Sequence, residues 1–186
     1  SCVPKGFIAM VPPIIILTLA VSLKTMTSGL GAAEFVRDLM YGASSGLYSL
    51  LPAVIFVVAC ILAFASGTSW GTFGILIPIT TAIFPTSSEL LIIGISACCA
   101  GAVCGDHCSP ISDTTIMAST GAQCDHVNHV STQLPYAMTV AAVCVIGYLL
   151  SGFVHNVFVV LGFSVVLMLA VLFAIRYFAK RKESKS

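Results

Sequence analysis

The chain has 186 residues, of which 58% are apolar and only 8% are charged, and its mean hydropathy is +1.06. Soluble domains do not reach this combination, so the composition predicts an all-α protein that crosses a cell membrane several times. A net charge of +1, with no basic patch interleaved with aromatic residues, argues against a nucleic-acid partner.

Four apolar segments come close to the roughly 20 residues that a helix needs to cross a bilayer. They are Phe7–Leu23, Leu47–Ser66, Pro135–Val154 and Val157–Ile175. Between the first two, residues 24–46 carry charged residues on one side of a helical wheel and apolar residues on the other. This pattern predicts an interfacial loop or a short surface helix.

Two further segments, Ser66–Phe84 and Glu89–Ala122, are long and apolar but have polar centres rich in glycine and proline. Pro110 lacks a backbone donor and disfavours helix at Ser109, so the second segment should break there. Broken helices are tolerated in a membrane only where they are buried in protein or line a watery cavity, and they usually mark transport sites. Residues 47–84 fit either two full spans or a re-entrant hairpin.

The basic residues predict the orientation. The positive-inside rule places a tail with this many basic residues in the cytoplasm. They are Arg176, Lys180, Arg181, Lys182 and Lys185. Counting spans backward then puts the loop 123–134 in the cytoplasm and residues 24–46 outside.

Asp106 and Asp113 fall within the second broken segment, and no Lys or Arg lies between Arg37 and Arg176 to pair with them. Each Asp at the centre of a membrane helix costs about 2.5 to 3.5 kcal/mol unless it is solvated or paired. The partner should therefore be a proton, a bound cation or water. The alternative is a break at the membrane surface, with both acids touching the cytosol.

The stretch GTSWG, Gly67–Gly71, fits the nucleophile elbow of a hydrolase. Asp106 and Asp113 and then His126 follow it, so the order Ser, Asp, His of a catalytic triad is present. The elbow needs a strand before the serine, whereas Ser69 lies between two apolar arms of membrane length. A tight turn that presents the oxygens of Thr68, Ser69 and Thr72 to a hard cation is the better interpretation. In the competing interpretation, these hydroxyls only bond to neighbouring backbone carbonyls.

Most of the eight cysteines lie in apolar runs and are expected to be reduced packing residues. One denser group of cysteines and histidines could bind zinc, although its spacing matches no known zinc module. The group comprises Cys104, His107, Cys108, Cys124, His126 and His129. The three histidines could also sense pH or simply be solvated at the membrane surface.

Two strings, TSWGTFGILIPI (Thr68–Ile79) and GDHCSPISDTTIMASTGAQCDHVNHVSTQLPYA (Gly105–Ala137), resemble the NhaC family of Na⁺/H⁺ antiporters. The resemblance covers essentially the whole chain as the C-terminal half of a longer transporter, here a single transmembrane domain over residues 1–186. It implies inverted repeats, each with a re-entrant hairpin and a broken helix. Residues 47–84 would then be a hairpin opening outward with its tip at Gly67–Gly71.

The combined expectation is a secondary antiporter, not an enzyme, that needs no cofactor and exchanges Na⁺ for H⁺ through Asp106 and Asp113. Further oxygen ligands are expected from Thr68, Ser69, Ser112 and Thr114. The breaks would be shaped by Gly67, Gly71, Gly105 and Pro110. Expected partners are the bilayer, the N-terminal half of the same transporter and a second copy in a homodimer. The alternatives are a Na⁺-coupled exchanger of organic acids such as malate or lactate, a membrane hydrolase and a non-transporting membrane subunit.

Overall fold

The computed structural model describes residues 45–86 and 88–183, together with seven residues of the first 44: Pro4, Phe7, Ile8, Val11, Thr18, Ser22 and Met26. The predicted span 7–23 and the loop 24–46 therefore lie largely outside the described residues. The described part is helical and contains no strand, which confirms the prediction of an all-α protein. Four of its helices are long and apolar enough to cross a membrane.

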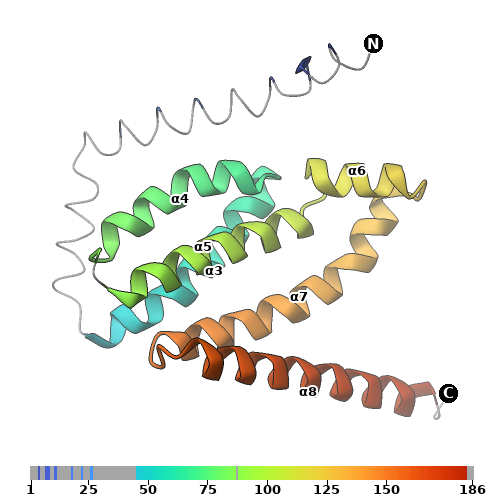
Figure 1. Cartoon of the computed structure of the whole chain (residues 1–186). Coiled ribbons are helices and arrows are strands. Elements are labelled where there is room, and N and C mark those ends of the chain that lie inside the picture. The colour runs from blue at the N-terminus through green and yellow to red at the C-terminus, as the bar shows by residue number, and fades with distance from the viewer. Residues whose placement is uncertain are drawn as a thin grey trace.

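The main-chain path runs back and forth through the helices, except that α6 continues in roughly the direction of α5 (Figure 1). In chain order they are α3 (Ser45–Ser66), α4 (Ser69–Ile83), α5 (Glu89–Cys108), α6 (Asp113–Gly121), α7 (His126–Ser151) and α8 (Val157–Glu183). The chain enters α3 and α5 at the same end of the bundle and returns between them through α4 (Figure 1). With 15 residues, α4 is shorter than the roughly 20 residues of a complete crossing, and it is not among the four helices long enough to span a membrane.

Close contact between α3 and α5 forms the centre of the core. Gly101 lies against the backbone carbonyl of Phe56, and Gly105 lies against that of Cys60. Ala59 and Ala63 of α3 are completely buried. Because lipid is as apolar as a leucine side chain, small residues hold membrane helices together by letting the backbones approach closely.

Gly101→Ala is expected to destabilise the bundle, because the added Cβ would overlap the Phe56 carbonyl and Cβ of Ala59, and backbone cannot move aside cheaply. Overpacking of this kind costs about 1 to 3 kcal/mol or more. A lower melting temperature of the purified protein in detergent would show it. Gly162→Ala on α8 is the matched control, because nothing lies within 4 Å of the added atom; equal melting temperatures for the two variants would contradict the packing argument.

The start of α7 corrects one predicted boundary. Residues 123–134 were expected to form a loop, but α7 begins at His126 and continues through Pro135 to Ser151. The Asp125 side chain caps this helix by accepting a hydrogen bond of 2.8 Å from the backbone N–H of Asn128. Helix α8 begins at Val157, as predicted, and extends beyond the predicted end at Ile175 to Glu183.

Candidate functional site

The turn between α3 and α4 depends on Gly67. Its φ of +66° lies in the left-handed region that favours glycine, and its N–H donates to the Ala63 carbonyl over 2.8 Å. Thr68 follows in an extended conformation, and no side chain caps the first turn of α4. The Thr72 hydroxyl donates to the Thr68 carbonyl over 3.0 Å. For this threonine the structure therefore agrees with the alternative that the hydroxyls bond to neighbouring backbone carbonyls.

The break between α5 and α6 lies where Pro110 predicts it. Helix α5 ends at Cys108, and the N–H of Ser109 turns back to the Asp106 carbonyl over 3.0 Å. Ser109 and Ser112 are both fully buried. The hydroxyl of Ser112 lies 2.7 Å from that of Thr114, so the two form a hydrogen-bonded pair at the start of α6.

The turn and the break meet at the same end of α3 and α5 (Figure 1). A Cβ added to Gly67 would lie 2.9 Å from the Ile111 carbonyl oxygen. Farther along the antiparallel pair of α4 and α5, a Cβ added to Gly94 would lie 3.0 Å from Cγ2 of Thr80. The two polar segments singled out in the sequence therefore come together.

The two acids have different surroundings. Asp106 is only 6% exposed, and its Oδ1 has no hydrogen-bond partner in the described part of the chain. Asp113 is exposed and accepts a hydrogen bond of 2.8 Å from the N–H of Thr114 at the start of α6. A buried carboxylate oxygen without a donor is costly, so Asp106 and not Asp113 is the acid left with an unsatisfied buried oxygen.

Thr115 is a site candidate that the sequence analysis missed. It is 3% exposed, and its Oγ1 also finds no hydrogen-bond partner among the described residues. Membrane threonines ordinarily bond to a carbonyl of their own helix, as Thr80 does to Leu76 over 2.8 Å. The sequence contains no signal that separates Thr115 from such residues. Its adjacency to the predicted ligand Thr114 was the only hint.

The histidines do not form a metal centre. In residues 45–86 and 88–183, no three His, Cys, Asp or Glu side chains are grouped so as to hold a metal ion, so the zinc alternative has no support there. His107 is exposed and His129 is half-buried. The ring of His126 lies between the Pro110 carbonyl, at 2.7 Å, and the Ser119 hydroxyl, at 3.0 Å.

Ser69 lacks the setting of a hydrolase nucleophile. It is the first residue of α4, and helices flank the turn at Gly67 on both sides, so the strand that an elbow requires is missing. The His126 ring bonds to Ser119 and Pro110, which leaves neither ring nitrogen for a serine at position 69.

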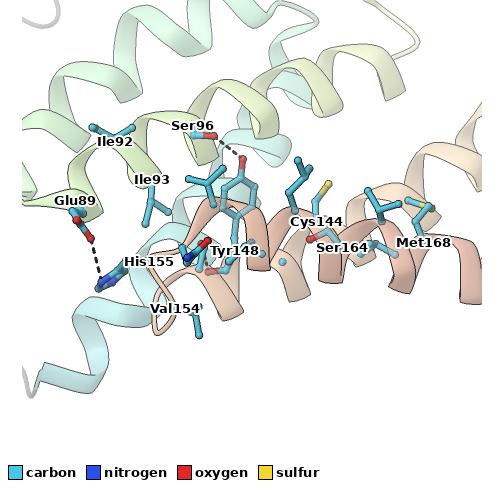
Figure 2. Close-up of a pocket in the computed structure, with 18 of the residues that line it drawn as sticks. Glu89, Ile92, Ile93, Ser96, Cys144, Tyr148, Val154, His155, Ser164 and Met168 are labelled. Atoms are coloured by element: carbon cyan, nitrogen blue, oxygen red, sulfur yellow. Dashed lines mark hydrogen bonds and ion pairs between the residues drawn. The ribbon is translucent and has the colours of Figure 1, made fainter.

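A separate groove lies between α5, α7 and α8 (Figure 2). Among its lining residues, Glu89 and His155 form an ion pair of 3.5 Å, and the Ser96 and Tyr148 hydroxyls are 3.1 Å apart. Its remaining lining is mostly apolar and includes neither Asp106 nor Asp113. The groove is therefore distinct from the place where the turn and the break meet.

The chain is similar to two bacterial proteins. Over 172 residues, 92% of the chain, it is 42% identical to an uncharacterized protein of Haemophilus influenzae and covers 33% of it. Over 116 residues, 58% of the chain, it is 31% identical to the malate-2H⁺/Na⁺-lactate antiporter of Bacillus subtilis and covers 25% of it. The chain thus spans about a third or less of the length of these relatives.

No solved structure shows significant similarity to the chain. Residues 1–153, however, match the Na⁺/H⁺ antiporter family, and this range contains both the turn at Gly67 and the break at Pro110. The resemblance noted in the sequence is confirmed by this match and by the similarity to a Na⁺-lactate antiporter. The chain belongs to the Na⁺/H⁺ antiporter family.

Proposed function

We propose that the chain is part of a secondary antiporter that exchanges Na⁺ for H⁺ across the cell membrane, with Asp106 as the group that binds each ion in turn. The observation that supports this most strongly is the buried Oδ1 of Asp106 without a hydrogen-bond partner among the described residues. No Lys or Arg occurs from residue 38 to residue 175, so this stretch offers no lysine or arginine to neutralise the carboxylate. A proton or a Na⁺ ion would do so.

The surrounding oxygens suit a hard cation. Na⁺ resembles Ca²⁺ and Mg²⁺ in its preference for carboxylate, hydroxyl and carbonyl oxygens. We infer that Thr115, with its free buried hydroxyl, joins Asp106 in the site. The polar groups of the turn and the break, Thr68, Ser69, Ser112 and Thr114, are the next candidates. Asp113, being exposed, would attract cations to the entrance and exchange them with Asp106.

Exchange follows from competition for one carboxylate. A proton that binds to the Asp106 carboxylate removes its negative charge, so Na⁺ is displaced. A bound Na⁺ in turn disfavours protonation of the same carboxylate. Because the carboxylate is costly to leave buried and empty, the transporter would rearrange between its two sides only with one ion bound. Each cycle would then carry Na⁺ in one direction and H⁺ in the other.

The basic residues at the end of the chain determine the proposed orientation of the transporter in the membrane. We place the end of α8 in the cytoplasm, which puts the turn at Gly67 and the break at Pro110 toward the cytoplasmic side. Inverted-repeat transporters form their ion site between two halves. We therefore propose that an N-terminal half of the same transporter completes the site, and that two copies associate in the membrane.

The test of this function is proton movement in inverted membrane vesicles that contain the complete protein. Adding Na⁺ should release protons from an acidified lumen, and raising Na⁺ should shift the pH profile of activity toward lower pH. If one proton competes with one Na⁺, the shift approaches about one pH unit for each tenfold change in Na⁺. Li⁺ and K⁺ serve as comparison ions, and a profile that does not move with Na⁺ would refute the competition.

A second candidate function is Na⁺-coupled exchange of organic acids. It is favoured by the 31% identity to the malate-2H⁺/Na⁺-lactate antiporter. The same vesicle assay separates the two, because this function requires malate, lactate or a related carboxylate for Na⁺ movement, whereas simple Na⁺/H⁺ exchange does not.

A further inference from the structure

The groove between α5, α7 and α8 is about as long as one leaflet of a bilayer is thick. Helix α7 contacts both α5 and α8, and the groove runs along all three from the loop between α7 and α8. Figure 2 shows Glu89 and His155 at one end and Met168 toward the other. On α8 the lining reaches from Val157 to Leu169, which is about 18 Å of helix. The hydrocarbon of one leaflet is about 15 Å thick, half of the roughly 30 Å core. The groove therefore extends from one membrane surface to about the middle of the membrane.

The lining of the groove is mostly apolar. Aliphatic side chains such as Ile93 on α5 and Val143 on α7 make up most of it. Three of the hydroxyls that line it are already hydrogen bonded. Those of Ser96 and Tyr148 lie 3.1 Å apart, and that of Ser151 donates to the Tyr148 carbonyl over 2.9 Å. The groove therefore suits a hydrocarbon chain.

The end of the groove beside the loop is polar and offers both an acceptor and a donor. The side chain of Glu89 is 75% exposed although it pairs with His155 at 3.5 Å, so its carboxylate can accept further hydrogen bonds, as from an ammonium group. Asn156 accepts through Oδ1 from the N–H groups of Phe158 and Val159, over 3.1 and 3.3 Å. Its NH₂ group therefore remains to donate, as to a phosphate. Together these side chains match a zwitterionic lipid headgroup.

A lipid fits the groove better than another helix does. The groove has a volume of about 780 Å³, whereas a helix of the same length and about 10 Å across would occupy about 1,400 Å³. None of the most apolar 18 residues of α8 is buried within the described part of the chain. Helix α8 also lies beyond residue 153, where the match to the antiporter family ends. The bilayer is therefore the expected neighbour of this groove.

We propose that a phospholipid with an amine headgroup binds in this groove, with one acyl chain along α7 between α5 and α8, its ammonium group at Glu89 and its phosphate at Asn156. Because lipid chains are as apolar as the lining, burial of the chain gives little driving force, and packing and headgroup contacts supply the affinity. The bound chain fills the space between α5 and α8 and holds α8 in place. With the end of α8 in the cytoplasm, this lipid belongs to the outer leaflet. Its binding does not depend on ion exchange.

The experiment places the complete protein in vesicles that contain phosphatidylethanolamine with a photoreactive diazirine in its acyl chain. Peptide mass spectrometry identifies the labelled positions. Wild-type protein should be labelled more strongly at the lining residues within 92–96 of α5 and 143–148 of α7 than on the surface of α8 outside the groove. Val165→Trp should lower this labelling at least about fivefold, because the indole takes the space in which the chain makes its van der Waals contacts.

Val166→Trp is the matched control and should keep the wild-type labelling. Val165 and Val166 are neighbours on α8, 51% and 66% exposed, and only Val165 lines the groove. Val160→Trp, in the lining, and Val159→Trp, outside it, form a second pair that decides the question if Val165→Trp fails to accumulate. Equal labelling in both members of a pair would mean that the label comes from ordinary surrounding lipid, and it would overturn the proposal.

The headgroup contact is tested by competition with phosphatidylcholine, whose trimethylammonium group has no N–H to donate. Wild-type protein should retain the amine lipid about tenfold over phosphatidylcholine, and Glu89→Gln should bring this ratio close to one. Asp125→Asn makes the same kind of change at an exposed acid outside the groove and should keep the preference. Equal retention of both lipids by wild type would refute the contact with Glu89.

A photoreactive amino acid in place of Leu161, which lines the groove, identifies the occupant directly. Cross-links to phosphatidylethanolamine would support the proposal. Cross-links to another segment of the transporter or to a second copy of it would overturn the proposal, because the groove would then be a protein interface.

Discussion

Asp106→Asn is expected to abolish Na⁺-driven proton movement while leaving a folded protein in the membrane. Asparagine has nearly the same shape, so the packing at this 6% exposed position is preserved. The amide carries no charge and neither binds nor releases a proton in the physiological range, so the site loses the group for which Na⁺ and H⁺ compete. Replacing an unpaired buried carboxylate with a neutral amide should also raise the melting temperature, since the burial of charge is costly.

The control for this variant is Asp125→Asn. Asp125 is exposed and caps α7, and asparagine is an equally good N-cap, so both stability and exchange should remain near wild type. The measurement is fluorescence dequenching of a pH-sensitive dye in vesicles after a Na⁺ pulse. Normal exchange by Asp106→Asn would exclude this residue as the carrier and leave Asp113 as the remaining acid of the break.

The spans of the described region could be predicted because the bilayer imposes a length and a composition on every crossing helix. This holds for α3 and α8, whose apolar runs begin within two residues of the observed helices. The break at Ser109 could be predicted for a different reason, since Pro110 lacks a backbone donor and disfavours helix at the residue before it.

The start of α7 could not be predicted from hydropathy, because residues 126–134 are polar and their helix depends on a cap and on contacts to the break. Asp125 supplies the cap, and the Gln133 side chain reaches the His107 carbonyl. Pro135 looked like the first residue of a span, since proline is favoured at helix starts, but here it lies inside the helix. In a membrane protein such prolines are tolerated where neighbouring groups satisfy the freed carbonyl.

The candidate site was only partly predictable. Composition identified the turn and the break as polar segments, and the contact of Gly67 with Ile111 confirms that these segments meet. The difference between Asp106, which lies before the break, and Asp113, which follows it, depends on the direction of each side chain, which no spacing encodes. The lack of a partner for Thr115 Oγ1 is likewise a property of the packed structure, and so is the placement of His126 between Ser119 and Pro110.

The second large effect is expected at the contact between turn and break. Gly67→Ala should reduce Na⁺-driven exchange at least about tenfold, for two additive reasons. Alanine at a φ of +66° is strained by about 1 to 2 kcal/mol. Its Cβ would also lie 2.9 Å from the Ile111 carbonyl oxygen and 2.8 Å from Cγ1 of the same residue, so the break would have to move relative to Asp106.

A second substitution separates these two causes. Asparagine tolerates the left-handed region better than alanine, so Gly67→Asn relieves most of the strain but keeps the Cβ against Ile111. If contact with the break matters, Gly67→Asn should lose as much exchange as Gly67→Ala while its melting temperature recovers. Gly121→Ala, where nothing lies within 4 Å of the added atom, should behave as wild type. Wild-type exchange in Gly67→Asn would mean that the hairpin turn acts through its own conformation alone and that its contact with Ile111 does not position the ion site.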